Sequence, residues 1–188
     1  MHCAERPGRA GFTLAELLVV ISIIGLMTYV VAQSFDALVP SERLNTAVRN
    51  MTAVLRDARS DAISKNLPHY VEYDLAQRRY RILYPYSRDI GVFREGVDNE
   101  ERRLASAWEL LPDGVEFHAL FIAGSPYNGS EPYRVLFDPR GSATEHSVVL
   151  SQPRYEAHYT IEVFALSGHF RMHDGIWQRP PVEDGDFR

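Results

Sequence analysis

The densest apolar stretch of the chain lies near its N-terminus. From Leu17 to Phe35, 19 residues follow one another with no ionisable side chain except Tyr29. A helix rises about 1.5 Å per residue, so this stretch would span roughly 28 Å, close to the ~30 Å hydrocarbon core of a bilayer. The pattern predicts a membrane anchor or the apolar part of a signal peptide, because a soluble helix of this length would show a polar face.

A second helical pattern follows, with apolar residues on one face only. Asp36 ends the uncharged run, and Pro40 predicts a kink or a short break before the helix restarts at Ser41. The apolar positions then recur at helical spacing: Leu44, Ala47, Val48, Met51, Leu55, Ala58 and Ala62. This stripe predicts an amphipathic helix packed on a sheet.

From Pro68 onward the apolar pattern changes to alternation, with turn residues between the runs. Such runs predict antiparallel strands. They contain Val71, Tyr80, Phe117, Val135, Val148, Ile161 and Phe170. The segment 138–141 (Asp-Pro-Arg-Gly) predicts a tight turn, and Gly168 suits a positive φ in the last hairpin. Residues 87–103 and 124–132 read as surface loops, and the tail is expected to dock through Trp177.

Composition and charge narrow the class of protein. The 188 residues are 45% hydrophobic and 24% charged with a net charge of -5, which fits a folded chain and disfavours wholesale nucleic-acid binding. A single cysteine, Cys3, excludes an internal disulfide. No nucleophile elbow, metalloprotease helix or phosphate loop is present, and His169 and His173 would lie about 13 Å apart along a strand. We therefore expect no enzyme and no catalytic, metal or cofactor site.

The flanks of the apolar run leave two interpretations open. Arg6 and Arg9 precede it and favour a cytoplasmic N-terminus. A secretory signal peptide could be cut after Ala32, which would release a secreted β-domain protein beginning at Gln33. That reading places Glu16 at the edge of the apolar region, where an unpaired carboxylate costs up to a few kcal/mol.

The residues Gly11-Phe12-Thr13-Leu14-Ala15-Glu16-Leu17-Leu18-Val19-Val20-Ile21 resemble the type IV prepilin signal. The resemblance implies that a prepilin peptidase cuts between Gly11 and Phe12, that the new amine of Phe12 is methylated, and that the apolar helix is kept. It also implies that Glu16, fifth from the cut, serves assembly.

The spacing of Phe12 and Glu16 has its own physical reason. The two residues are one helical turn apart, so the carboxylate of Glu16 could pair with an ammonium at Phe12 of its own chain or of a neighbour. When helices stack side by side, such a pair would offset the desolvation of both charges and set the axial register. The alternative is a Glu16 carboxylate that reaches the headgroup boundary by itself.

Three segments in the body of the chain are similar to minor pseudopilins of the GspH/FimT type: residues 55–63 with Asn66, residues 137–141, and residues 166–171. The resemblance implies an α+β fold, with a long N-terminal helix packed on an antiparallel β-rich head of two sheets. It implies a minor pseudopilin of a type II secretion pseudopilus, with other pseudopilins, the prepilin peptidase and an inner-membrane assembly platform as partners.

These inferences divide the chain as follows: leader peptide 1–11, transmembrane and assembly helix 12–39, amphipathic helix 40–66, β-rich head 67–173 and C-terminal tail 174–188. The expected location is the bacterial inner membrane, crossed once, with the head in the periplasm. A FimT-like pilin of a type IV pilus, active in assembly or DNA uptake, is the alternative. DNA binding would need a basic patch, and we interpret Arg78, Arg79, Arg81, Arg102 and Arg103 as a solvated face.

Overall fold

The computed structural model describes residues 12–89 and 91–179, without the side chains of residues 30–41. The predicted leader 1–11, which includes Gly11, and residues 180–188 of the tail lie outside the described residues. The chain divides into two compact units, Met1–Val39 and Pro40–Arg188. Each unit is described by itself below.

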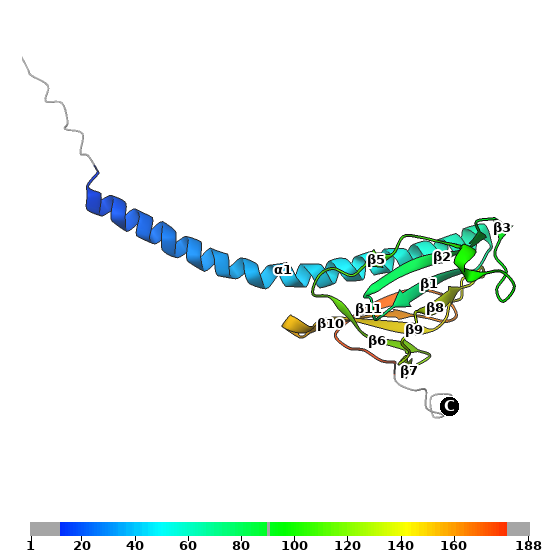
Figure 1. Cartoon of the computed structure of the whole chain (residues 1–188). Coiled ribbons are helices and arrows are strands. Elements are labelled where there is room, and N and C mark those ends of the chain that lie inside the picture. The colour runs from blue at the N-terminus through cyan, green and yellow to red at the C-terminus, as the bar shows by residue number, and fades with distance from the viewer. Residues whose placement is uncertain (1–11, 90, 180–188) are drawn as a thin grey trace, which may run out of the picture. The chain divides into compact units, whose positions relative to one another are not determined.

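One helix, α1, covers Leu14–Lys65 (Figure 1). The predicted short break at Pro40 and restart at Ser41 are wrong, because α1 includes both residues. The alternative, a kink at Pro40, stays a prediction. A proline removes only the hydrogen bond that its own nitrogen would donate, and the turns on either side can remain helical. The helix ends at Asn66, whose φ of 51° is left-handed. The N–H of Leu67 donates to the Ala62 carbonyl at 3.2 Å, which closes the last turn.

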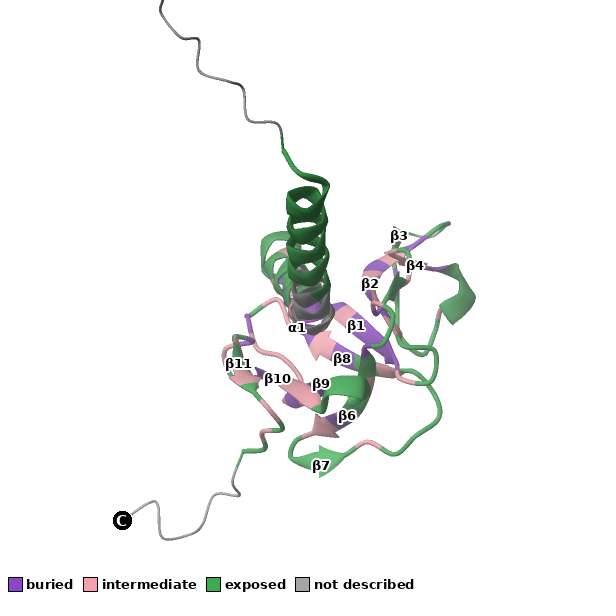
Figure 2. Ribbon diagram, turned by 90° about the vertical axis from the view of Figure 1, so that its left-hand side faces the viewer, coloured by how far each residue is buried: buried purple, intermediate pink, exposed green. Residues whose placement is uncertain are grey.

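The second part of α1 buries the predicted apolar stripe within the Pro40–Arg188 unit. All seven predicted positions are 5% exposed or less, and Val54 joins them. Figure 2 shows buried residues on the strands of both sheets. Because apolar residues at helical spacing form one continuous strip, the helix contributes one wall of the head's core.

The head contains two antiparallel sheets, as predicted. The first sheet has the order β3-β2-β1-β8, and β4 and β5 also pair with β2. Its strands are β1 His69–Asp74, β2 Arg79–Ser87, β3 Gly91–Val92, β4 Arg103–Ala105, β5 Glu109–Leu110 and β8 Tyr133–Phe137. The antiparallel strands predicted around Val71 and Tyr80 are confirmed as β1 and β2, which pair with each other, with Tyr73 opposite Tyr80.

The second sheet has the order β11-β10-β9-β6-β7. Its strands are β6 Glu116–Ile122, β7 Ser125–Pro126, β9 His146–Gln152, β10 Ala157–Val163 and β11 Phe170–Asp174. Short 3₁₀ helices cover Glu100–Arg102 and Pro153–Tyr155. The two segments predicted as loops therefore carry short strands, which are too brief to show alternation in the sequence.

A buried polar chain joins the two sheets through the core. The Tyr73 hydroxyl of β1 lies 3.2 Å from Nε2 of His146 on β9, and Nδ1 of His146 lies 2.7 Å from the Thr144 carbonyl. A carbonyl only accepts, so Nδ1 carries the proton and Nε2 accepts from the tyrosine. Both side chains are almost fully buried. These directional hydrogen bonds fix the position of one sheet relative to the other, whereas a purely apolar contact would allow several positions.

Candidate assembly site

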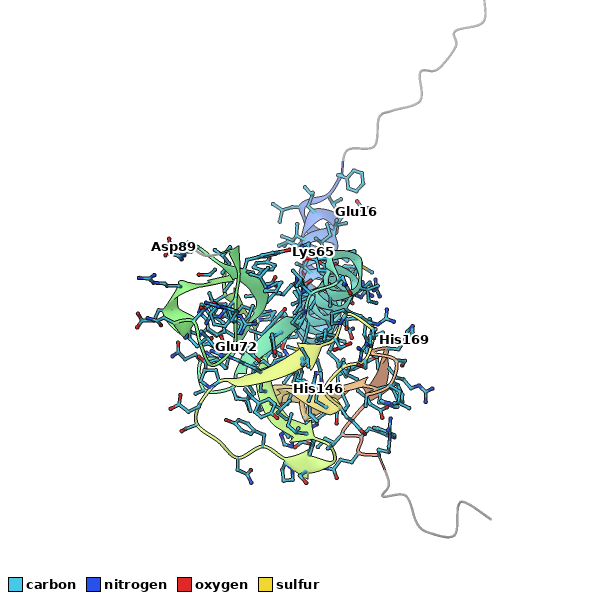
Figure 3. The ribbon with its side chains drawn as sticks, turned by 90° about the vertical axis from the view of Figure 1, so that its right-hand side faces the viewer. Glu16, Lys65, Glu72, Asp89, His146 and His169 are labelled. Carbon is cyan, nitrogen blue, oxygen red and sulfur yellow. The ribbon has the colours of Figure 1, made fainter. Side chains whose placement is uncertain are left out.

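The first turn of α1 is closed by a reciprocal contact between Thr13 and Glu16. The N–H of Glu16 donates to the Thr13 hydroxyl oxygen at 3.3 Å, while the Thr13 N–H and hydroxyl both lie 3.4 Å from Oε2 of Glu16. Figure 3 shows Glu16 near the N-terminal end of the described helix. This is a capping box, and Thr13, which the sequence analysis overlooked, is its cap. The spacing Thr-x-x-Glu was the signal that could have revealed it.

The capping contacts leave room for a stronger partner of the Glu16 carboxylate. Both donors lie at 3.4 Å, long for hydrogen bonds to a charged group, which are usually about 2.7–2.9 Å. In the uncleaved chain the nitrogen of Phe12 is a peptide N–H, so the ammonium that we expected as its partner exists only after cleavage. The Phe12 side chain is 75% exposed.

The described apolar side chains that follow Glu16 are exposed throughout. The large ones from Leu17 to Tyr29 are between 42% and 68% exposed. The hydroxyls of Ser22 and Thr28 each donate to the carbonyl four residues earlier, at 2.8 Å, so neither needs water as a partner. A Cβ added at Gly25 would meet nothing within 4 Å. Among the described residues, no helix is long and apolar enough to cross a membrane.

In the head, the three segments that carry the family resemblance meet at the end of α1. Nε of Arg59 donates to the Ser167 carbonyl at 3.0 Å. A Cβ added at Gly168 would lie 2.6 Å from the Gly141 carbonyl oxygen and 3.1 Å from Arg59, and one added at Gly141 would lie 3.7 Å from Ile63. Both glycines have positive φ, of 58° and 90°. The hairpin can therefore approach the turn and the helix end this closely only because Gly168 lacks a side chain, whereas Gly141 is favoured by its positive φ.

The expectation of a solvated arginine face is wrong for two arginines of β2. Arg79 and Arg81 lie opposite Asp74 and Glu72 of β1, and their guanidinium nitrogens approach those carboxylates to 2.9 and 2.6 Å. Both guanidinium groups also lie over the Trp108 ring, at 4.1 and 4.0 Å from its centre. Strand register decides this pairing, because residues directly opposite on neighbouring strands come into contact.

Arg103 is likewise not part of a solvated face. Its side chain is only 3% exposed, and its guanidinium group lies 4.5 Å from the Tyr70 ring centre and 4.7 Å from that of Phe93. Nε donates to the Tyr84 carbonyl at 3.1 Å. Arg103 thus fastens the charged excursion 87–103 to the first sheet. Arg102, in contrast, is 57% exposed and pairs with Asp89 at 3.6 Å.

The histidines divide into core and surface groups. His69 and His146 are buried, and burial lowers the pKa of both, that of His146 to about 4. His169 is exposed. Within residues 12–89 and 91–179, no three His, Cys, Asp or Glu side chains gather in a group that could hold a metal ion.

The tail docks on the second sheet as far as it is described. The Trp177 ring stacks on that of His173 at 4.1 Å, and the backbone N–H of Trp177 donates to the Thr160 hydroxyl oxygen at 3.0 Å. Arg179 bridges Glu145 and Glu162 at 3.0 and 2.6 Å. The segment that follows β11 is therefore held by stacking and by charge.

A capped N-terminal helix with exposed apolar side chains, followed by a head of two antiparallel sheets, defines a subunit of the pilin class. Residues 6–28 match the prokaryotic N-terminal methylation motif, and residues 47–167 match the family described as type II transport protein GspH. Because the second match covers more than half of the chain, the chain belongs to the GspH family and is a minor pseudopilin of type II secretion. The methylation motif implies processing by a prepilin peptidase.

Solved structures agree on the fold. Two structures of the minor pseudopilin EpsH from the type II secretion system of Vibrio cholerae superpose on this chain with TM-scores of 0.51 each, at 13% and 16% identity. The alignments cover 70% and 74% of this chain and 97% and 99% of those chains. No curated protein sequence matches the chain. The family membership implies a membrane-anchored structural subunit that assembles with other pseudopilins.

Proposed function

We propose that this pseudopilin is a single-pass protein of the bacterial inner membrane, cleaved between Gly11 and Phe12 and methylated on the new amine of Phe12. Its head stands in the periplasm, and its N-terminal helix packs against other pseudopilins in the fibre. The observation that carries the proposal is the contrast within one helix. Its first part leaves every described apolar side chain exposed, whereas its second part buries an apolar stripe in the head.

The anchor rests on the chemistry of residues 17–35. Their large apolar side chains are exposed where they are described, and the Ser22 and Thr28 hydroxyls are bonded inside the helix. Lipid or a neighbouring apolar helix can pack against these side chains, and no polar group of the helix loses a hydrogen bond as a result. Arg6 and Arg9 ahead of it favour a cytoplasmic leader.

The direction of insertion is tested by labelling an exposed residue of the head. Leu166 is 95% exposed at the turn between β10 and β11, and Cys3 is the sole native cysteine. In a C3S background, L166C should react in spheroplasts with a maleimide that cannot cross the inner membrane. In cells that lack the prepilin peptidase, so that the leader is retained, a variant with its only cysteine in the leader should not react. Labelling of the leader instead of the head would contradict the proposed orientation.

Processing is tested by the mass of the mature N-terminus. Cleavage after Gly11 leaves methylated Phe12 as the first residue, and the apolar helix remains in the protein. A secreted β-domain protein cut after Ala32 would begin at Gln33 instead. Mass spectrometry of the purified chain distinguishes these products, and recovery of Gln33 as the first residue would end the pseudopilin interpretation.

Assembly is proposed to use Glu16 as the partner of the Phe12 ammonium of a neighbouring subunit. The Thr13 contacts hold the carboxylate near the end of the helix at 3.4 Å, so it is placed but weakly bound. Cleavage creates the amine one turn away. Breaking a buried ion pair by removing one partner typically costs about 3–5 kcal/mol, which is more than a tenfold effect on incorporation.

The matched variants are E16Q, E16D and T13V. E16Q keeps the shape and removes the charge, so we expect normal membrane insertion but a loss of the chain from sheared fibres. E16D keeps the charge and should retain part of the incorporation, whereas T13V removes only the cap and should assemble close to normally. Equal recovery of E16Q and the unsubstituted chain in fibres would contradict the pairing.

A further inference from the structure

The outer face of the second sheet brings a buried serine and a histidine into one row. Ser151 of β9 pairs with Glu116 of β6 on one side and with His158 of β10 on the other. Side chains of directly opposite residues leave a sheet on the same face. Leu150, the residue before Ser151 on β9, is fully buried in the core. Because successive side chains of a strand point to opposite faces, the row of Ser151 points away from the core.

A β-bulge directs a second histidine to the same place. The pairing of β6 with β9 shifts between Phe117, opposite Leu150, and Ala119, opposite Val149. His118 is therefore the extra residue. Bulges redirect side chains, and here the ring of His118 meets that of His158 although β9 lies between their strands. The ring centres are 4.9 Å apart with the planes at 79°.

Two polar groups near this pair are available to a ligand. Nδ1 of His158 lies 3.2 Å from the Glu156 carbonyl, which can only accept, so Nδ1 carries the proton and Nε2 presents a lone pair. A carbonyl partner of this kind is the usual support of a metal-binding imidazole. Between the two strands, the Ser151 hydroxyl is buried and has no hydrogen-bond partner among the described residues.

The separation of the ring centres is compatible with one shared ion, and it is also the separation of an ordinary edge-to-face pair, so a metal titration decides between the two. With a metal–nitrogen distance of about 2.0–2.1 Å, an imidazole centre lies roughly 3 Å from the metal, and a tetrahedral angle places two centres about 5 Å apart. The observed 4.9 Å agrees. We propose that His118 and His158 together bind a divalent transition-metal ion of the zinc and copper class, with water in the remaining positions and the Ser151 hydroxyl as a donor to one of those waters.

The site is tested with the full chain in detergent, in an H2A/C3S background so that the leader contributes no ligands. Calorimetric titration with Zn²⁺ should show one saturable equivalent per chain. H118A should weaken binding by at least about tenfold, and H158Q likewise, because each removes one of two protein ligands. H169A, which removes another exposed histidine, should leave the titration unchanged.

A second measurement separates loss of the site from loss of the fold. His118 is exposed, so H118A should unfold at the same temperature as the parent chain in the absence of metal. With Cu²⁺ as the probe, electron paramagnetic resonance should show two imidazole nitrogens in the parent chain and one in H118A. Saturable Zn²⁺ binding that H118A leaves intact, or no saturable binding by the parent chain, would overturn the proposal.

Discussion

The two described parts of α1 are equally helical but differ in what buries their apolar side chains. Leu26, in the first part, is 68% exposed, whereas Leu55, in the second, is fully buried. The second part has a polar face and an apolar stripe, and the stripe finds the sheets of its own chain. The first part is apolar all round, and its described apolar side chains are exposed. Apolar side chains favour burial in both parts of the helix. Their distribution around the helix decides whether they pack against the sheets of the same chain or against lipid and other helices.

The largest expected effect follows from truncating one leucine in each part. L55A should lower the free energy of unfolding of the head by about 2–5 kcal/mol, because it leaves a cavity in a closed core. L26A should change it by less than about 0.5 kcal/mol. Both tryptophans, Trp108 and Trp177, lie in the head, so urea unfolding followed by their fluorescence reports on the head alone. Similar losses in the two variants would contradict the contrast.

The pH dependence of stability should also belong to the head. Burial lowers the pKa of His146 from 6.5 to about 4. Between these pH values His146 is protonated in the unfolded chain but not in the folded chain. Its contribution to the free energy of unfolding is therefore fully present above pH 6.5 and is lost as the pH falls toward 4. The loss should reach about 3 kcal/mol.

Urea unfolding at pH 7, 5.5 and 4 measures this loss. H146Q should flatten the profile, although His69, whose pKa is also lowered by burial, keeps part of the slope. H169A should retain the full slope, since it changes only an exposed histidine. An H146Q profile as steep as that of the parent chain would show that another group carries the effect.

A matched pair of glycine substitutions sharpens the comparison further. G168A places a methyl group 2.6 Å from the Gly141 carbonyl oxygen at a φ of 58°, and we expect a loss of about 1–3 kcal/mol in the stability of the head. G25A meets nothing within 4 Å, and alanine favours a helix over glycine by about 0.8–1.0 kcal/mol. The isolated subunit should therefore tolerate G25A, and thermal unfolding compares the two. A G168A head as stable as the parent would contradict the close approach.

The smallest effect is expected at the helix cap. T13V removes a capping contact that is typically worth about 0.5–2 kcal/mol, but the loss acts only on the first turn. Amide hydrogen exchange should quicken near Leu17, while the unfolding temperature of the head stays constant. T28V is the control, because its hydroxyl is bonded to the Ile24 carbonyl inside the helix. Unchanged exchange in T13V would show that Thr13 does not cap the helix.

Local periodicity explains which elements the sequence could predict. The helical stripe from Leu44 to Ala62 and the β1–β2 hairpin repeat over enough residues to be read directly. Strands such as β3 and β7 contain two residues each, so no alternation could reveal them. The short break at Pro40, one of the two expectations for that residue, was wrong because the turns on either side of a proline can remain helical.

The candidate assembly site was only partly visible in the sequence. The position of Glu16 followed from its spacing to Phe12, and its role in assembly stays a proposal. Its contact with Thr13 was encoded in the same residues and overlooked. The partners of Arg81 and Arg103 could not be predicted from the sequence, because they depend on which strands lie side by side and in which register.

The sequence by itself indicated the order of a prepilin-like signal, an apolar helix, an amphipathic helix and a β-rich head, because each pattern depends on residues close along the chain. Only the tertiary structure decided that Arg59, Gly141 and Gly168 meet at the helix end, that Tyr73 and His146 link the sheets, and that a bulge brings His118 to His158. These contacts join residues far apart in the chain, and their geometry depends on strand order and register, which no local pattern specifies.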